Sequence, residues 1–319
     1  MGFAIVSDIH SNLAAFQAVL DDIKGLQQKL KIDQIFCLGD IIGYGCQPVQ
    51  VLNLVRQHIG SKNTVVGNHE DLYWGSLCAD VDPKAMLMAT YNRYLIDEDE
   101  LSRSFVNSLN HNQHYVKTLR YKKYRLFITH NGPDSDYLTY RYPWHDSLLP
   151  DLQTKFEDRV PKATGIKSLI SKPRTDLFFF GHTHFPTVAF REVDGTYTSV
   201  KLNLEFSFEE VPGPDKKILI NPGSVGYSRD NNPAASYMVI DEKNQKLIHR
   251  RVQYRFDSSG YEEASDWLRA NYIDKDILGK NQIWELVDNV RGVAEGGTFG
   301  ANPLTLAYDG WREYYDLHD

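Results

Sequence analysis

The chain has 319 residues, 42% of them hydrophobic and 24% charged, which is an ordinary composition for a globular protein with a sizeable core. Its net charge of −7 argues against binding through phosphate neutralisation, so we expect no stable nucleic-acid complex. No apolar run approaches the ~20 residues that span a bilayer, and the first residues lack signal-peptide features. The three cysteines are not spaced as a zinc-binding motif. We therefore expect a cytoplasmic protein that does not enter the membrane.

The N-terminal part of the chain alternates apolar runs with amphipathic segments, as in a βαβαβ unit. Apolar runs of strand length predict buried strands at residues 3–6, 35–38 and 64–66. A helix is expected over residues 13–25, with Ser11 or Asn12 as its N-cap. A second helix is expected to begin at Pro48, a residue favoured in the first helical turn.

The remainder of the chain is predicted to be helical, then strand-rich, then helical again. Residues 71–109 are expected to be helical, and we interpret their apolar stripe as core: Met86, Leu87, Tyr91, Tyr94 and Leu95. A strand should end at His130, a loop should cover the site over 131–150, and a short helix is expected over 163–170. Five later strands are expected to form a second, largely mixed sheet packed on the first: 187–190, 197–208, 217–220, 237–240 and 247–254. The pattern is helical again from Ser258.

Polar side chains of one chemical kind follow the predicted strands. These residues are Asp8, His10, Asp40, Asn68, His69, His130, His182 and His184. Open α/β sheets place their sites at the carboxyl ends of the strands, so we expect these side chains to meet. A backbone that leaves its strand at Gly181 can turn both following imidazoles toward one point. A lone histidine is usually structural, but five such clusters indicate one binuclear metal site.

The residue types also indicate how such a site would be divided. A two-metal site needs a bridging anion between ions ~3.5–4 Å apart, and Asp40 is the candidate. Asp8 and His10 with one of the two later histidines would serve one ion, and Asn68 and His130 with the other would serve the second. Carboxylate, imidazole and amide ligands without thiolate suit Mn, Fe, Zn or Ni, and the sequence does not choose among them.

Five short motifs resemble those of the calcineurin-like metallophosphoesterases, in their usual order, within a match that covers roughly residues 1–254. They are Asp8-x-His10, Gly39-Asp40, Gly67-Asn68-His69-Glu70, Thr129-His130 and Gly181-His182-Thr183-His184. Residues 39–45 and 221–226 resemble the small YfcE-like members and relatives described as diadenosine-tetraphosphatase-like. The resemblance implies an α/β fold, a four-layer α/β/β/α sandwich of two mixed sheets flanked by helices. It implies a metallophosphoesterase domain over residues 1–256, with residues 257–319 as a helical extension and tail packed on it.

The resemblance also implies a role for each residue. Asp8, His10, Asp40 and His184 would bind the first divalent ion, and Asp40, Asn68, His130 and His182 the second. Mn is favoured over Fe, Zn, Ni or Mg. A water or hydroxide between the ions would attack phosphorus, with Asp40 as the catalytic bridge. His69 would not touch metal but would assist the leaving group, while Glu70 would stabilise its turn.

The expected activity is metal-dependent hydrolysis of a phosphate ester, with a phosphomonoester favoured. The substrate would be a small phosphorylated molecule or a phosphoprotein, bound by Asn68, His69 and Arg229, although an arginine in such a loop is often only solvated. A phosphodiesterase or dinucleoside-polyphosphate hydrolase is the alternative. An inactive interaction scaffold ranks lower because every predicted ligand and His69 are present. The segment 221–224 could be a simple turn or could border the site, and a homo-oligomer is possible.

Overall fold

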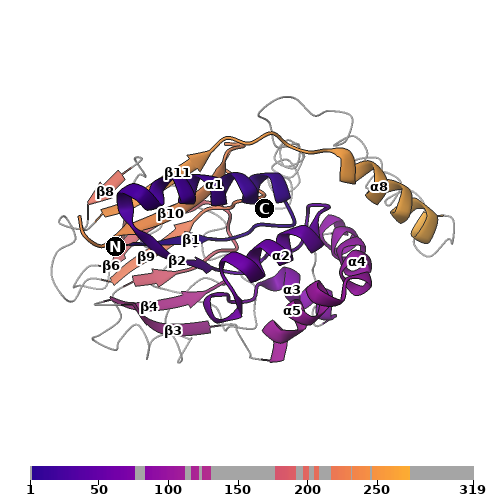
Figure 1. The fold of residues 1–319 in the computed structure, drawn as a ribbon, viewed down its shortest axis with the longest axis horizontal. Helices are drawn as coiled ribbons and strands as arrows, with labels where there is room; N and C mark the ends of the chain where they lie inside the picture. Colours follow the sequence, from indigo (N-terminus) through magenta and orange to yellow (C-terminus); the bar gives the residue numbers. More distant parts are fainter. Residues whose placement is uncertain are drawn as a thin grey trace.

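The computed structural model describes residues 2–75, 83–111, 116–121, 124–130, 177–191, 197–200, 205–207, 217–230, 232–244 and 246–273. Two mixed β-sheets lie face to face, and helices cover one of them (Figure 1). The expected loop over 131–150, the expected helix over 163–170 and the tail beyond 273 lie outside these residues. The described part therefore contains three of the four expected layers, and the fold class is confirmed as α/β with two mixed sheets and flanking helices.

The five-stranded sheet has the strand order β2-β1-β10-β11-β8. Its strands are β1 (Gly2–Val6), β2 (Ile32–Cys37), β8 (Glu205–Ser207), β10 (Ala235–Asp241) and β11 (Lys246–Val252). β1 and β2 are parallel, with Ala4 opposite Ile35, and the other neighbours are antiparallel. Along β1, Ala4 and Val6 contact the helix-side core while Phe3 and Ile5 contact the core between the sheets. The strand is apolar throughout because both of its faces are buried.

The six-stranded sheet has the strand order β3-β4-β5-β9-β6-β7. Its strands are β3 (Val116–Tyr121), β4 (Tyr124–Thr129), β5 (Leu177–Phe179), β6 (Pro186–Arg191), β7 (Tyr197–Val200) and β9 (Lys217–Pro222). β4, β5 and β9 run parallel to one another, and the outer pairs are antiparallel. Aromatic rings fill the space between the sheets, including edge-on pairs of Phe3 with Phe36 and with Phe179.

Three expectations about the strands are wrong. The later strands do not form a sheet of their own, because β8, β10 and β11 join β1 and β2 while β6, β7 and β9 join the other sheet. The expected single strand over 197–208 is divided between the two sheets as β7 and β8. Residues 64–66 make only one bridge, between Thr64 and Cys37, so the third strand of the expected βαβαβ unit is too short to be a strand.

The helices on the five-stranded sheet begin where the sequence predicts. α1 (Leu13–Leu30) follows Asn12, whose side chain accepts a hydrogen bond from the Ala15 N–H, so Asn12 is the N-cap. α1 packs on β2, β10 and β11. α2 (Pro48–His58) begins at the expected proline and packs on α1. The short turn η1 (Ser61–Asn63) follows α2.

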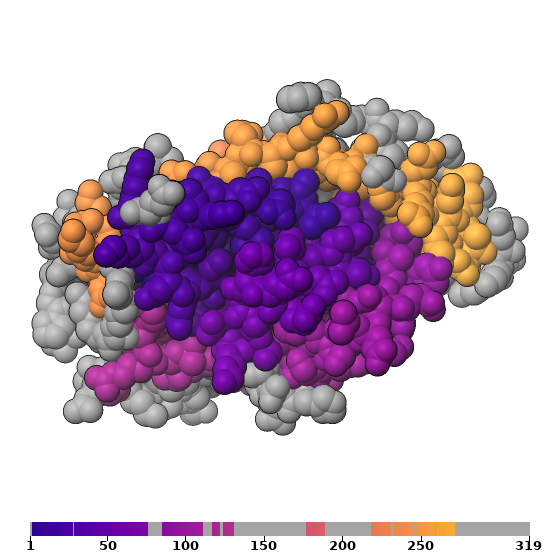
Figure 2. All heavy atoms as spheres, in the orientation of Figure 1, coloured from indigo at the N-terminus to yellow at the C-terminus, as the bar shows by residue number. Residues whose placement is uncertain are grey.

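The remaining helices form one end of the molecule, beside α2 (Figures 1 and 2). They are α3 (Asn68–Trp74), α4 (Pro83–Glu98), α5 (Glu100–His111), α8 (Ser259–Leu268) and the π-helical turn η4 (Arg269–Ile273). The expected apolar stripe of α4 is only partly core. Leu87 and Tyr91 are buried, but Met86 is 37% exposed and Tyr94 is 43% exposed. Tyr94 stacks on Trp267 of α8, which explains an aromatic residue on that face. None of the described helices is long and apolar enough to cross a membrane.

An ion pair fastens α1 to the sheet and makes a testable contribution to stability. Arg250 of β11 donates to both carboxylate oxygens of Asp22, at 3.0 and 2.7 Å, and the Tyr237 hydroxyl donates to the same carboxylate at 2.6 Å. Partial burial raises the pKa of Asp22, but the hydrogen bonds from Arg250 and Tyr237 lower it overall. We expect Asp22→Asn to reduce the free energy of unfolding by about 1–2 kcal/mol, because it removes the charge that strengthens these hydrogen bonds. The effect is no larger because the ion pair is partly exposed to solvent.

Urea unfolding measures this effect, and Asp21→Asn at the exposed neighbouring position of α1 is the matched control. The pKa of Asp22 is lowered in the folded state. Its contribution to stability is therefore fully present at pH values above the ordinary aspartate pKa, and it is lost as the pH falls through the folded-state pKa. The difference between wild type and Asp22→Asn should therefore be larger at neutral pH than at low pH. If Asp22→Asn and the control Asp21→Asn had equal unfolding free energies at neutral pH, the ion pair of Asp22 with Arg250 would not stabilise the fold.

Candidate metal centre

The backbone at the strand ends adopts an unusual conformation that brings the predicted ligands together. Five of the seven predicted ligands are non-glycine residues with positive φ: Asp8 (53°), His10 (49°), Asp40 (50°), His182 (68°) and His184 (60°). Such residues are uncommon, and they cluster at functional sites where strain is maintained by surrounding contacts. Gly181 allows close approach, since a Cβ atom there would lie 2.1 Å from Ser7 Oγ and 2.9 Å from Asp8 Oδ2. The turn therefore delivers the two imidazoles to the end of β1.

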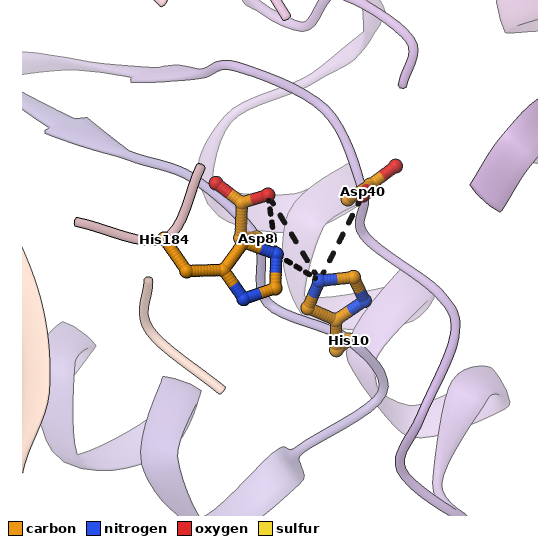
Figure 3. A group of neighbouring side chains, drawn as sticks. All are labelled: Asp8, His10, Asp40 and His184. Carbon is orange, nitrogen blue, oxygen red and sulfur yellow. Dashed lines mark hydrogen bonds and ion pairs between the residues drawn. The ribbon is translucent and has the colours of Figure 1, made fainter. Parts of the chain in front are cut away.

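The first group of donor atoms comes from both sheets. Asp8, His10 and Asp40 follow β1 and β2, and His184 follows β5 (Figure 3). His184 Nε2 lies 3.2 Å from Asp8 Oδ1 and 3.1 Å from His10 Nε2. His10 Nε2 lies 3.9 Å from Asp8 Oδ1 and 3.7 Å from Asp40 Oδ2. Donors ~2.1 Å from one ion and at about right angles are ~3 Å apart, so these spacings suit a common cation.

The second group shares Asp40 with the first. Asp40, His130 and His182 form it, with Asn68 at the start of α3 beside them. His130 Nε2 lies 3.3 Å from Asp40 Oδ2 and 3.1 Å from Asn68 Oδ1. His182 Nδ1 lies 2.9 Å from Asn68 Oδ1. The same oxygen, Asp40 Oδ2, thus faces His10 of the first group and His130 of the second. All seven predicted ligands are brought together, in the predicted division.

Hydrogen bonds on the outer side of the rings show which lone pairs face the centre. His130 Nδ1–H donates to the Leu38 carbonyl at 2.8 Å, and His184 Nδ1–H donates to the Tyr227 carbonyl. A neutral ring that donates from Nδ1 presents the lone pair of Nε2. These lone pairs point at carboxylate and amide oxygens, which are also acceptors. Acceptors converge in this way when a cation lies among them, so the donor set fits two metal ions.

The charge of the site leads to the same conclusion. Asp8 and Asp40 are 0% and 1% exposed. Burial raises the pKa of both carboxyls, but the neighbouring imidazoles lower it overall, so both are anionic. Burial lowers the pKa of His182 to about 3, and it lowers the pKa of His10 as well, which leaves neutral imidazoles. Burial lowers the pKa of His130, but the Asp40 carboxylate raises it to about 9, so this ring holds a proton that a bound metal ion would displace. One imidazolium compensates only part of the charge of two buried carboxylates, and divalent ions would compensate it fully.

His69 lies beside the two donor groups and belongs to neither. Its backbone N–H donates to Asp40 Oδ1 at 2.9 Å, and its ring contacts His10 edge-on at 4.6 Å between centroids. The ring is packed over Gly43, which has a φ of 141°. A Cβ atom at Gly43 would lie 2.4 Å from His69 Nδ1 and 2.5 Å from His10 Nδ1. Glycine is required there for both imidazoles to keep their places.

The structure also identifies supporting residues. The Glu70 carboxylate accepts from the N–H groups of Gly67, Asp40 and Ile41 at 2.7, 3.0 and 2.8 Å. It thereby connects the loop after β2 to the start of α3. Glu70 therefore stabilises its turn, as predicted. Ser224 Oγ–H donates to the Asp8 carbonyl at 2.7 Å, and the Gly226 N–H donates to the same oxygen. The segment 221–226 thus borders the site at the backbone of Asp8.

Two tyrosines and Arg229 line one side of the site. The rings of Tyr44 and Tyr227 stack with centroids 4.4 Å apart, and both contact His10. The Arg229 guanidinium lies 5.7 Å from the Tyr227 ring centroid, and it helps to lower the pKa of His184 and His69 after the larger effect of burial. The guanidinium charge is therefore close enough to act on the site. The aromatic pair was not predicted: Tyr44 lies in the segment 39–45, but the sequence assigned neither tyrosine a role.

Fold and site together define the class: a two-sheet α/β protein with a candidate two-ion centre at its strand ends. The sequence profile of the calcineurin-like phosphoesterase superfamily domain matches residues 1–245. An uncharacterized protein of Methanocaldococcus jannaschii, MJ0912, is 34% identical over 252 residues, covering 79% of this chain and 87% of that protein. The chain belongs to the calcineurin-like phosphoesterase superfamily, as the motifs predict.

Solved structures support the fold assignment. A metallophosphoesterase from Sphaerobacter thermophilus has a TM-score of 0.56 and 24% identity, with 91% of this chain and 99% of that chain covered. A hypothetical protein from Pyrococcus horikoshii has a TM-score of 0.56 and 16% identity, with 91% and 97% covered. Members of the superfamily depend on divalent metals, for which this chain has candidate ligands. The domain boundary at 256 stays a prediction.

Proposed function

We propose that the protein is a metal-dependent hydrolase of phosphate esters with two divalent ions, and that it prefers phosphomonoesters. The observation that carries the proposal is the convergence of two donor groups on one oxygen, Asp40 Oδ2, which faces His10 at 3.7 Å and His130 at 3.3 Å. A single buried carboxylate oxygen between two groups of donor atoms suits a bridge between two cations.

In this proposal each sheet end contributes to both ions. Asp8, His10, Asp40 and His184 would hold one ion, and the other would be held by Asp40, Asn68, His130 and His182. The ions would supply Lewis acidity and an activated water for in-line attack on phosphorus. Manganese is the proposed metal on the family resemblance, and oxygen and imidazole donors without thiolate are compatible with it as they are with Fe, Zn and Ni. The carbonyls of Leu38 and Tyr227 keep two of the imidazoles oriented toward the ions.

His69 and Arg229 are proposed to act on the substrate. His69 would assist the leaving group, by stabilising the transition state or by protonating the leaving oxygen, since it lies next to Asp40 and outside both donor groups. Arg229 would bind a phosphate oxygen through its guanidinium, and Asn68 would also contact the substrate. A phosphomonoester carries more negative charge than a diester, so this additional cation favours the monoester. The proposed substrate is a small phosphorylated molecule or a phosphoprotein.

Hydrolysis of p-nitrophenyl phosphate and of its bis ester tests this function. We expect chelation of the metal ions to reduce turnover by at least about 10³-fold, because the ions would supply several kcal/mol of transition-state stabilisation. Added Mn²⁺ should restore turnover more fully than Mg²⁺ or Ni²⁺, and the monoester should be the better substrate. Magnesium added to protein that was never chelated is the control for effects of ionic strength.

Other outcomes would refute all or part of this proposal. Cleavage of the bis ester alone would refute the phosphomonoesterase and favour a phosphodiesterase or a dinucleoside-polyphosphate hydrolase. Turnover that persists after complete metal removal would refute a metal-dependent reaction. No turnover of either ester with any metal would favour an interaction scaffold.

A further inference from the structure

One side chain of helix α4 reaches between the two loops that carry the predicted ligands of β1 and β2. Asn92 is 0% exposed. Its Oδ1 accepts from the Ser11 hydroxyl at 2.5 Å and from the Gly43 N–H at 3.1 Å, and its Nδ2–H donates to the Gly45 carbonyl at 2.9 Å. A helix outside the site is thereby hydrogen-bonded to residues adjacent to His10.

The two loops that Asn92 connects are held in a costly conformation. His10, Ser11 and Asp40 all have φ near 50°, a conformation that is unfavourable for non-glycine residues unless the surrounding contacts maintain it. Backbone hydrogen bonds run from His10 N–H to the Asp40 carbonyl at 3.0 Å and from Gly45 N–H to the His10 carbonyl at 2.7 Å. Asn92 adds hydrogen bonds to Ser11 in the first loop and to Gly43 and Gly45 in the second.

The chemistry of the contacts requires an amide. The Gly43 N–H and the Ser11 hydroxyl need an acceptor, whereas the Gly45 carbonyl needs a donor, and one asparagine side chain supplies both. An aspartate of the same shape would place a carboxylate oxygen against the Gly45 carbonyl. A leucine would remove the acceptor of the Ser11 hydroxyl and the donor to the Gly45 carbonyl, and it would leave the Gly43 N–H with only its longer bond to Ser11 Oγ at 3.2 Å. The position of Gly43 matters most, since His10 Nδ1 and His69 Nδ1 both lie against it.

We propose that Asn92 is a positioning residue of the metal centre, which keeps the loop 40–46 in place against His10 and His69. Loss of a hydrogen bond that orients metal ligands typically changes metal affinity by about 10–100-fold. The inference rests on the proposed function only through its metal ions, so metal affinity decides it even without turnover.

The test compares Asn92→Ala and Asn92→Asp with Asp97→Asn as the matched control. Asp97 lies on the same helix, accepts from the Tyr73 hydroxyl at 2.9 Å and pairs with Arg93, and among the described residues its side chain makes no hydrogen bond to the ligand loops. Calorimetric titration of metal-free protein with Mn²⁺ should show a dissociation constant raised about 10-fold or more in both Asn92 variants. Asp97→Asn should stay within about twofold of wild type. Where turnover is measurable, kcat should fall with KM nearly unchanged.

The outcomes separate positioning from general stability. Wild-type Mn²⁺ affinity in Asn92→Ala would overturn the proposal, and so would an equal loss of affinity in Asp97→Asn. If Asn92→Ala does not fold, Ser11→Ala removes one of the same hydrogen bonds and should raise the dissociation constant about 3–10-fold. A wild-type protein that binds Mn²⁺ without hydrolysing either ester would refute the proposed function alone. A wild-type protein that binds no Mn²⁺, Mg²⁺ or Ni²⁺ would refute both.

Discussion

Replacing Asp40 with asparagine is expected to empty both metal positions and to abolish turnover, by about 10³-fold or more. Asp40 Oδ1 is occupied by the His69 N–H at 2.9 Å, so Oδ2 alone faces His10 and His130. An amide of the same shape keeps the volume but removes the negative charge that both ions would share. Elemental analysis of the purified protein should show metal reduced from about two ions per chain.

Asp22→Asn is the matched control for this experiment, because it makes the same chemical change at a carboxylate remote from the site. Its metal content should equal that of wild type even though its stability is reduced. If Asp40→Asn retained both ions, the carboxylate would not be their bridge. If Asp22→Asn also lost metal, the content would report folding rather than ligation.

Replacing His69 with alanine is expected to leave the metal content unchanged and to reduce turnover by about 10²-fold or more. His69 lies outside both donor groups, and its Nδ1 has no hydrogen-bond partner among the described residues. A general acid matters most when the leaving oxygen is strongly basic. The loss should therefore be larger for an alkyl phosphate than for p-nitrophenyl phosphate.

Metal content and the ratio of the two substrates together assign the role of His69. His58→Ala, at an exposed position on α2, is the control for removal of an imidazole. An emptied site in His69→Ala would make His69 a ligand. An equal loss for both leaving groups would indicate stabilisation of the transition state without proton transfer.

The sequence predicts the ligand-bearing ends of the strands well, because each consists of an apolar run followed by a short polar motif. His130 follows β4 and His182 follows β5 as the motifs predict. Pairing of the strands was not predictable in the same way. β10 is buried along its whole length, so its pattern does not distinguish one sheet from the other, and its pairing with β1 depends on the tertiary fold.

Residues that support the site were harder to find than the residues that form it. Asn92 adjoins Tyr91 within a helix whose apolar residues indicate only core. Its partners lie 81 and 49 positions away in Ser11 and Gly43, and no local pattern encodes such contacts. The isolated amide in a buried stripe was the available signal, since a buried polar side chain needs hydrogen-bond partners.

The candidate centre has one consequence for the molecule as a whole, because its donors come from both sheets. Asp8 and Asp40 leave one sheet, and His130 and His184 leave the other. Bound ions would therefore cross-link the two layers, much as a disulfide ties distant parts of an oxidised protein. Anything that binds only the native state adds to its stability. A cell short of the metal would then lose intact protein as well as activity.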